Sequence, residues 1–284
     1  MTRFDNVIIR VAITTHHHHH PFNLSLYPFS AIPIVAVGIG STGAVYLGVN
    51  LEFEGLPHQY SIHANQFLVT NLALNFEEKL EYLAITSLGG HYFDAPCGHC
   101  RQFLQELPHA DDIEVLIKDA ANVKLETLGN LFPRSFVPAR NLERGTHLLL
   151  GHGPNLLSLS DGDLNCRRDS ERTLRIKALA AANKSFAPYG QSPSGVALMD
   201  SGGHLYAGWF MESVALSPSV GPLQAALVDF VTRSGGRGFS NIVNAVLVEK
   251  RGAKVGQADT ARILLQKITG GNCRLDVFYC SEEH

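Results

Sequence analysis

Apolar and polar positions along the chain form short hydrophobic runs that are bounded by small, turn-forming residues, a pattern typical of β-strands. These runs predict strands at Ile34 to Gly38, Ala44 to Val49, Tyr82 to Thr86, Gly195 to Met199 and His204 to Trp209. After the second run, apolar side chains recur at helical spacing, at Phe67, Leu68, Leu72 and Leu74. This spacing predicts a helix with most of an apolar face turned inward.

The two halves of the chain repeat the same series of turn and polar positions. At an offset of 160 residues, the matching pairs are Pro28 and Pro188, Ser41 and Ser201, Gly43 and Gly203, Tyr46 and Tyr206, Gly48 and Gly208, and Glu52 and Glu212. With a two-residue slip, Ser61 and Gln66 match Ser219 and Gln224. An ordered series of this kind predicts one supersecondary unit used twice.

Composition shifts divide the chain into four segments. The N-terminal one contains the histidine run His16 to His20, which we interpret as a tag or low-complexity stretch, with metal capture as the alternative. A stretch rich in charged and turn-forming residues separates the two repeats and predicts a linker. The predicted segments are an unstructured one at 1–26, a first domain at 27–157, a linker at 158–175 and a second domain at 176–284.

Charge and composition narrow the possible partners. The chain has 284 residues, 45% hydrophobic and 17% charged, with a formal net charge of −3. A slightly acidic chain does not favour binding to a nucleic acid polymer, which needs a basic surface. No apolar run reaches the length of a membrane helix and no signal peptide is evident, so we expect a cytoplasmic protein without a membrane partner. The 5 cysteines, an odd number, indicate reduced thiols rather than a disulfide framework.

Two short stretches carry candidate metal chemistry. Ser61 to Gln66 contains His63 at the start of one predicted helix, and Ala95 to Gln102 contains Pro96, Cys97 and Cys100 at the start of another. Two cysteines three residues apart at a helix start share a face near the positive end of the helix dipole, which favours thiolates. One imidazole and two thiolates leave a fourth position open on zinc, the arrangement of a catalytic site.

Other interpretations of these residues remain open at this point. A Cys-x-x-Cys pair in a cytosolic chain is also typical of a redox pair or of two unremarkable cysteines. His99 stands between the two cysteines, and on a helix it points away from the face that both sulfurs share, so we interpret it as structural or solvated. The three remaining cysteines have no partner at metal-ligand spacing, and we expect them to be packed or exposed: Cys166, Cys273 and Cys280.

Together the stretches resemble the cytidine deaminase family, in its two-domain homodimeric form with an active first half and a degenerate second half. The zinc deaminase signature is His-x-Glu followed by Pro-Cys-x-x-Cys. The resemblance covers the chain from about Tyr27 to near its C-terminus and implies an α/β fold with two three-layer α/β/α domains and mixed sheets. It implies that His63, Cys97 and Cys100 bind Zn²⁺.

The resemblance also implies a substrate site and an empty second site. Asn50 and Glu52 match the family segment that binds the sugar of cytidine or deoxycytidine. Without that context, a capped strand end or a surface polar pair is the preferred interpretation of these two residues. In the second half, Gly221 and Leu223 stand where the family has its His and Glu, so no metal is expected there.

The chain departs from the family at the catalytic position. The family's general acid and base is a glutamate two residues after the His ligand, and Asn65 stands there. The mechanism needs that carboxylate to take a proton from zinc-bound water and deliver it to the ring nitrogen. An amide does not ionise near neutral pH, and one such group contributes roughly a hundredfold to ten-thousandfold in rate. We therefore expect activity to be lost or vestigial.

Further departures lie around the same predicted site. Ile32 replaces the aromatic residue expected against the pyrimidine, and Pro33 removes a backbone donor. Leu88 to Asp94 reads as an insertion, which either displaces Cys97 and Cys100 from His63 or forms a surface bulge.

Three functions are consistent with this sequence. The leading hypothesis is an inactive or strongly impaired cytidine deaminase homologue, derived from zinc-dependent hydrolytic deamination in pyrimidine salvage, that keeps its zinc site and binds nucleoside. The second is an active enzyme in which water or another residue moves the protons. The third is a non-enzymatic subunit that modulates an active paralogue.

Overall fold

A computed structural model describes residues 26, 28–87, 93–118, 123–138, 142, 146–166 and 168–282. The segment predicted at 1–26 lies outside the described residues apart from Leu26, and so do residues 88–92 of the predicted insertion. The chain divides into two compact units. The first comprises residues 1–151 together with 213–218, and the second comprises residues 152–212 and 219–284.

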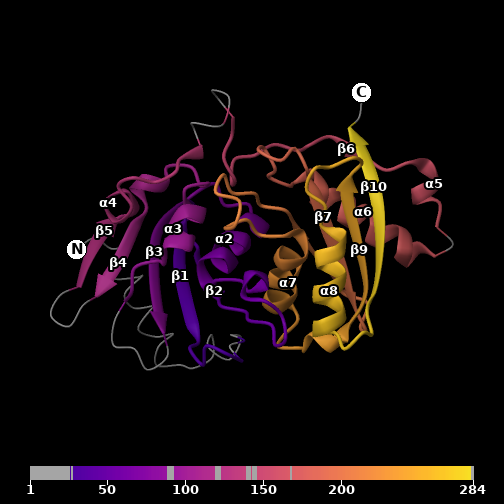
Figure 1. The fold of residues 1–284 in the computed structure, drawn as a ribbon, viewed down its shortest axis with the longest axis horizontal. Coiled ribbons are helices and arrows are strands. Elements are labelled where there is room, and N and C mark those ends of the chain that lie inside the picture. The colour runs from indigo at the N-terminus through magenta and orange to yellow at the C-terminus, as the bar shows by residue number, and fades with distance from the viewer. Residues whose placement is uncertain are drawn as a thin grey trace. The chain divides into compact units, whose positions relative to one another are not determined.

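The first unit is built on a five-stranded mixed sheet (Figure 1). In the order β2-β1-β3-β4-β5, its strands are Val45–Val49, Ile34–Gly40, Leu80–Ser87, Glu114–Lys118 and Val123–Thr127. Strand β1 runs antiparallel to β2 and β3, while β3 and β4 are parallel. The α-helices of its described part are α2 at Ala64–Leu74, α3 at Gly98–Leu104 and α4 at Leu128–Leu131, with short 3-10 turns at His58–Tyr60 and Ala110–Asp112.

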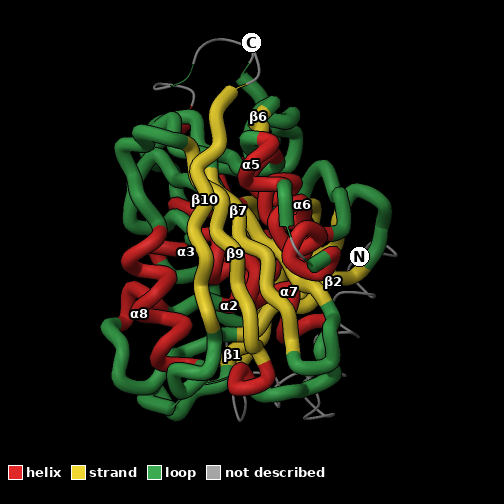
Figure 2. The backbone as a smooth tube through the Cα atoms, turned by 90° about the vertical axis from the view of Figure 1, so that its right-hand side faces the viewer, coloured by secondary structure: helices red, strands yellow, loops and turns green. Residues whose placement is uncertain are grey.

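The second unit contains a second five-stranded mixed sheet. In the order β6-β10-β9-β7-β8, its strands are Leu157–Ser158, Arg274–Glu282, Ile242–Lys250, Ser194–Asp200 and Leu205–Trp209. Strands β10, β9 and β7 run side by side in Figure 2. The helices are α5 at Asp161–Leu164, α6 at Asp169–Asn183, α7 at Pro222–Arg233 and α8 at Ala258–Ile268, with a 3-10 turn at Phe239–Asn241.

Helices cover both faces of the second sheet. Gly195 pairs with Trp209, whereas the adjacent Val196 pairs with Gly208, so the two glycines lie on opposite faces. A Cβ atom on Gly195 would meet the backbone of α6 at Ala182, and one on Gly208 would meet the backbone of α7. The second unit is therefore a three-layer α/β/α sandwich, as the resemblance implied.

Strand registers confirm the duplication. Val35 pairs with Val49 in the first sheet, and Gly195 pairs with Trp209 at the same offset in the second. Each central strand has an irregularity at its end, between Ile39 and Gly40 in β1 and between Met199 and Asp200 in β7. The strands predicted from the apolar runs are all present, with ends shifted by up to two residues.

Gly48 and Gly208 set the distance between sheet and helix in the two units. A Cβ atom on Gly48 would lie 2.1 Å from the Ala64 carbonyl oxygen at the start of α2. On Gly208 it would lie 2.0 Å from the Ala226 backbone nitrogen in α7. Because only glycine permits such an approach, this repeated residue fixes where α2 and α7 sit on their strands.

Helix α2 is buried more completely than its apolar spacing predicts. Every residue from Ala64 to Leu72 is buried, including the polar Asn65, Gln66 and Thr70, whereas Leu74 is only partly buried. A helix that is buried on all sides shows little amphipathic pattern. The sequence predicts one buried face for this helix, whereas the structure buries all of its sides from Ala64 to Leu72.

Residues 158–175, which the sequence predicts to be a linker, carry regular structure. They include α5 and the first turns of α6. Ser160 caps α5 by accepting a hydrogen bond from the Asp163 backbone nitrogen, and acidic residues occupy the first turn of α6. The polar residues that suggest a linker therefore serve as helix starts. Among the described residues, no helix is both long and apolar enough to cross a membrane.

Candidate metal centre

His63 occupies the N-cap position of α2. Its backbone is extended, and its amide nitrogen donates a hydrogen bond of 2.9 Å to Oε1 of Gln66, three residues into the helix. This bond satisfies an amide group that the helix itself leaves unpaired. With α2 held against β2 through Gly48, the position of His63 is fixed by both the helix start and the sheet.

Cys97 and Cys100 lie at the start of α3, as their spacing predicts. Cys97 is the N-cap and Cys100 is in the first turn. Arg101 anchors this turn, because its Nε donates to the Pro96 carbonyl oxygen at 2.6 Å and its Nη1 to the Leu131 carbonyl oxygen at 2.7 Å. The two sulfurs therefore rise from a braced helix start.

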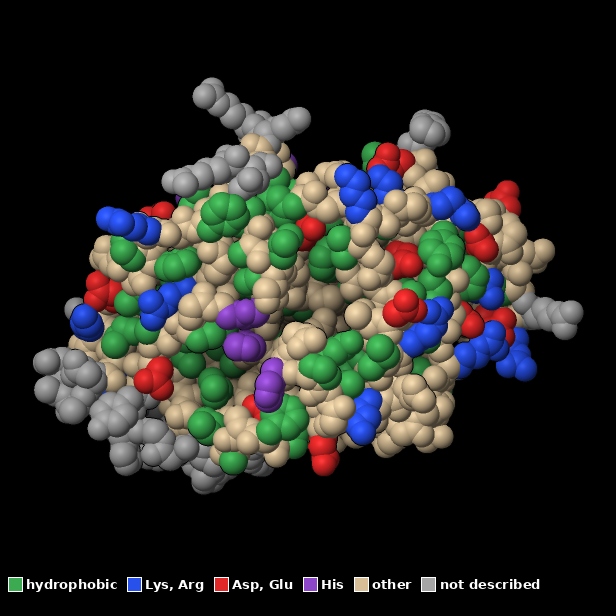
Figure 3. All heavy atoms as spheres, viewed as in Figure 1, with side chains coloured by type: hydrophobic (Ala, Val, Ile, Leu, Met, Phe, Trp, Pro, Cys, Tyr) green, Lys and Arg blue, Asp and Glu red, His purple; other side chains and the backbone are tan. Residues whose placement is uncertain are grey.

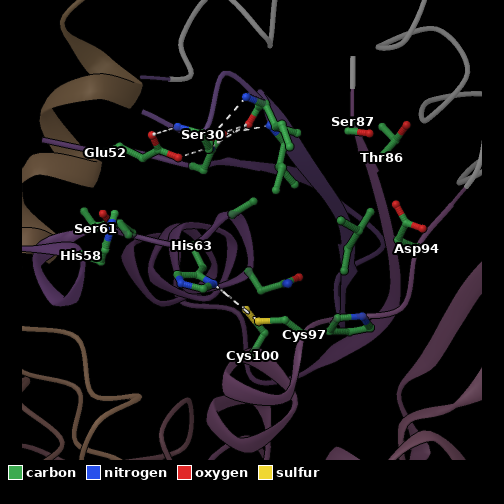
Figure 4. Close-up of a pocket in the computed structure, with 18 of the residues that line it drawn as sticks. Ser30, Glu52, His58, Ser61, His63, Thr86, Ser87, Asp94, Cys97 and Cys100 are labelled. Atoms are coloured by element: carbon green, nitrogen blue, oxygen red, sulfur yellow. Dashed lines mark hydrogen bonds between the residues drawn. The ribbon is translucent and has the colours of Figure 1, made fainter. Parts of the chain in front are cut away.

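The structure brings these three residues together from two helix starts, and the predicted insertion before Cys97 does not separate them. His63 Nδ1 lies 3.6 Å from Cys97 Sγ and 3.5 Å from Cys100 Sγ (Figure 4). Tetrahedral zinc with ordinary bond lengths places a nitrogen and a sulfur ligand about 3.6 Å apart. The donor set and its spacing both fit one zinc ion with a fourth position left for another ligand.

The pKa values of the two thiols are shifted in opposite directions. The hydrogen bond with Cys100 holds the pKa of the Cys97 thiol far below its usual value, and His63 lowers it further. The same hydrogen bond and burial raise the pKa of Cys100. These shifts favour the thiolate form at Cys97, which is the form that binds metal.

Asn65 lies beside this cluster with its side chain buried. It hydrogen-bonds the Cys100 sulfur, and its Oδ1 has no hydrogen-bond partner among the described residues. The donor to the sulfur is therefore Nδ2. A buried carbonyl oxygen without a donor costs free energy, so this atom is ready to accept a hydrogen bond from a ligand.

A pocket of about 620 Å³ opens over the cluster. Besides the three candidate metal ligands and Asn65, its walls include Phe29, Ile32, Asn50, Glu52, His58 and Asp94. Histidine side chains gather beside hydrophobic ones on the face drawn in Figure 3. The volume suits a small organic molecule, and the mixture of apolar walls with a few polar groups is typical of such sites.

Asn50 and Glu52 hold the segment that forms one wall of the pocket. Asn50 accepts a hydrogen bond from the Ile34 backbone nitrogen at 2.9 Å and donates to the Ile32 carbonyl oxygen at 3.1 Å. Glu52 accepts from the backbone nitrogens of Phe29 and Ser30 at 3.2 and 3.1 Å. Burial raises the pKa of Glu52, but the hydrogen bonds from Ser30 and Phe29 outweigh it and lower the pKa.

The second unit keeps the helix starts without the metal ligands. Gly221 caps α7 where His63 caps α2, and Leu223 stands at the position of Asn65. Gln257 is the N-cap of α8 where Cys97 is that of α3, with Thr260 in the place of Cys100. Sequence reasoning found the first two replacements and missed the last two, because no motif marks a lost cysteine.

Sequence reasoning also missed Asp94 and Gln66. Asp94 was assigned to an insertion, yet it lines the pocket. Gln66 was noted only as part of the repeat, although it bonds directly to the backbone of His63. The recurrence of this glutamine as Gln224 was the available signal for its structural role.

Comparison with known proteins agrees with this geometry. Two models of the family described as "Cytidine and deoxycytidylate deaminase zinc-binding region" match residues 14–115 and 128–262. Cytidine deaminase 7 of Arabidopsis thaliana is 52% identical over 91% of this chain and 85% of its own length.

Two further Arabidopsis thaliana proteins align over most of the chain. Cytidine deaminase 1 is 48% identical over 90% of this chain and 86% of its own length. The protein named "Probable inactive cytidine deaminase 4" is 39% identical over 90% of this chain and 84% of its own length. The chain therefore belongs to the zinc-dependent cytidine deaminase family, in a two-domain form.

Proposed function

We propose that this chain is a catalytically impaired cytidine deaminase homologue that binds zinc through His63, Cys97 and Cys100 and keeps a pocket for a pyrimidine nucleoside. Asn50 and Glu52 stand at the sugar end of this pocket. The observation that carries the proposal is Asn65, which lies against Cys100 at the position of the family's proton-transferring glutamate.

The chemistry of Asn65 explains the expected loss of rate. His63, Cys97 and Cys100 would hold a zinc ion, which would supply Lewis acidity to the pocket. The deamination then needs a group that takes a proton and returns it to the ring nitrogen and the leaving amine. The Asn65 amide neither ionises nor carries protons near neutral pH, and its Nδ2 is already engaged with Cys100. Asn65 can hold a ligand through Oδ1, but it cannot move the protons.

The relatives support both parts of this proposal. Their names give cytidine as the substrate of most, and one relative carries the name "Probable inactive cytidine deaminase 4". We infer that cytidine or deoxycytidine is the ligand of the pocket. The apolar Ile32, half exposed on the pocket wall, offers the base a less favourable contact than an aromatic ring would.

One observation favours an active enzyme as the second candidate. Asp94 also lines the pocket, and in Figure 4 it lies on the opposite side from Glu52. A carboxylate in this position could take over the proton transfer that Asn65 cannot perform. This candidate predicts that Asp94, rather than Asn65, is essential.

The test measures uridine formation from cytidine, and deoxyuridine from deoxycytidine, by zinc-loaded protein. Native chain, Asn65→Glu and Asp94→Asn are assayed side by side, each with its zinc content. We expect Asn65→Glu to be about 100- to 10,000-fold faster than the native chain, because one general acid-base group contributes that much. Asp94→Asn should leave the low native rate unchanged.

Other outcomes distinguish the alternatives. A native rate near that of Asn65→Glu contradicts the proposal. If Asp94→Asn then loses this rate, the chain is an active enzyme that uses Asp94 for proton transfer. If neither the native chain nor Asn65→Glu deaminates cytidine but both bind it, a regulatory subunit of an active paralogue becomes the better description. The family resemblance implies a homodimer, and the mass of the purified chain in solution tests that expectation.

A further inference from the structure

Gln66 is a buried residue that joins three neighbours of the metal centre. It lies one residue beyond Asn65 on α2 and is only 4% exposed. Its Oε1 accepts from the His63 backbone nitrogen at 2.9 Å, its Nε2 donates to the Pro218 carbonyl oxygen at 2.9 Å, and the same nitrogen lies 3.2 Å from His99 Nε2. Gln66 is neither a proposed zinc ligand nor part of the pocket lining.

Donor and acceptor rules fix the orientation of this side chain. A backbone amide only donates, so the atom facing His63 must be the oxygen. A carbonyl only accepts, so the atom facing Pro218 must be the nitrogen. The remaining hydrogen on Nε2 points to His99, whose Nε2 must therefore accept and carry no proton. Gln66 thus selects the His99 tautomer that bears its hydrogen on Nδ1.

His99 in turn lies against the candidate zinc ligand. The rings of His63 and His99 are stacked, with centroids 4.7 Å apart and planes inclined by 25°. His99 is half-buried and belongs to the first turn of α3, between the two cysteines. The His63 ring is therefore held by its backbone at one end and by a neutral, stacked ring along one face.

The anchor at Pro218 comes from residues 213–218, which belong to the first unit although they lie in the second half of the sequence. This segment has a second tie to the same unit, because the Val214 backbone nitrogen donates to Oε1 of Glu106 at 2.8 Å. Glu106 is fully buried, so this bond is well shielded from water. The segment thus presents the Pro218 carbonyl from a position that is itself held.

We infer that Gln66 is a positioning residue of the metal centre, which orients the ligand His63 and the stacked His99 together and is itself locked by the backbone of residues 213–218. This inference rests on the proposed zinc site at His63, Cys97 and Cys100. Groups that orient metal-bound histidines strengthen metal binding, and losing one costs about 10- to 100-fold in affinity. The second half of the chain therefore serves the first site even though it has lost its own.

The second unit offers a matched control. Gln224 accepts a hydrogen bond from the Gly221 backbone nitrogen at 2.9 Å, as Gln66 does from His63. Gly221 has no imidazole, so this cap supports a helix and no ligand. Gln224→Leu and Gln66→Leu therefore remove equivalent helix caps, and only Gln66→Leu affects the metal centre.

The experiment measures zinc affinity of the full chain by competition with a chromogenic chelator. We expect Gln66→Leu to bind zinc about 10- to 100-fold more weakly than the native chain, and Gln224→Leu to bind it normally. Gln66→Glu is the second variant, since it keeps an acceptor for the His63 amide but turns an acceptor toward Pro218 and His99. It should lose zinc affinity as well.

A second readout needs no variant. Nitrogen NMR of the native chain at neutral pH should find the His99 hydrogen on Nδ1, and in Gln66→Leu this preference should disappear. The inference is wrong if His99 carries its hydrogen on Nε2, or if both Gln66 variants bind zinc as tightly as Gln224→Leu. A native chain that binds no zinc overturns the proposed metal site itself, which is a separate and recognisable result.

Discussion

The two units use one scaffold and differ in what their helix starts present. In both, a glycine on the second strand lets a helix approach closely, and a glutamine three residues after the N-cap closes the helix start. In the first unit the caps are His63 and Cys97, and in the second they are Gly221 and Gln257. Both units keep the glycine and the glutamine that position the helix, whereas only the first unit has a cluster of histidine and cysteine side chains that could bind a metal, among the described residues.

The same comparison separates two residues that the family resemblance treats alike. Glu212 accepts from the backbone nitrogens of Tyr189 and Gly190, just as Glu52 accepts from Phe29 and Ser30. This carboxylate therefore holds the preceding segment even in a unit without metal ligands. Asn50, in contrast, has Phe210 at its equivalent position. Asn50 is thus specific to the first site, while Glu52 has a structural role in addition to any contact with ligand.

The two units also differ in the carboxylate that accepts a hydrogen bond from an equivalent tyrosine. The Tyr46 hydroxyl donates to Glu77 in the first unit, and the Tyr206 hydroxyl donates to Asp200 in the second, each at 3.0 Å. Gly40, at the end of β1, matches Asp200, at the end of β7. Both units keep the tyrosine, but its carboxylate partner lies between α2 and β3 in the first unit and at the end of β7 in the second.

The largest expected effect is on zinc binding, when Cys100 of the first unit is replaced by the residue that the second unit has at the equivalent position. Cys100→Thr places there the residue found at Thr260, and it removes one of the two sulfurs proposed as zinc ligands. We expect zinc binding to be lost, because a threonine hydroxyl does not replace a thiolate. Metal content after gel filtration measures this. Cys166→Ser, a change outside the cluster, should retain one zinc per chain, and equal zinc in both variants would contradict the assigned ligand set.

A second comparison uses the glycines under the two helices. Gly48→Ala and Gly208→Ala should each destabilise their unit by about 3 kcal/mol, because the added carbon meets helix backbone at 2.1 or 2.0 Å. Urea unfolding measures this loss. Gly48→Ala should also weaken zinc binding, since α2 carries His63 at its start. If Gly208→Ala weakens zinc binding to the same degree, the metal centre depends on more than the helix position of its own unit.

The smallest effect concerns pH. Burial raises the pKa of Asp200, but hydrogen bonds from His204 and Tyr206 outweigh it and lower the pKa from 3.8 to about 2. The ionised Asp200 therefore stabilises the fold above pH 3.8, and this contribution is lost as the pH falls toward 2.

Asp200→Asn tests this contribution. It should unfold about 2 kcal/mol more easily at neutral pH, since charged hydrogen bonds are lost. Its stability should also fall less than that of the native chain between pH 4 and pH 2, as chemical unfolding at several pH values would measure. Asp259→Asn, at an exposed site, is the control, and parallel pH curves for native chain and Asp200→Asn would refute the role of Asp200.

Much of the site was predictable because its chemistry lies in short motifs. The Cys-x-x-Cys spacing at a helix start, with a histidine at another helix start, predicted the three residues that the structure brings together. Gln66, His99 and Pro218 could not be joined in this way. Their contacts depend on how α2, α3 and a segment 152 residues further along pack, and no local pattern records such a separation.

The sequence by itself determined the strands, the duplication and the presence of an amide at Asn65, because each depends on residue type at fixed spacing. Only the tertiary structure decided that helix starts replace the predicted linker, that α2 is buried on all sides and that Asp94 reaches the pocket. The reason is physical. Local spacing fixes which face a residue occupies on its own element, whereas burial and contact depend on the elements that pack against it.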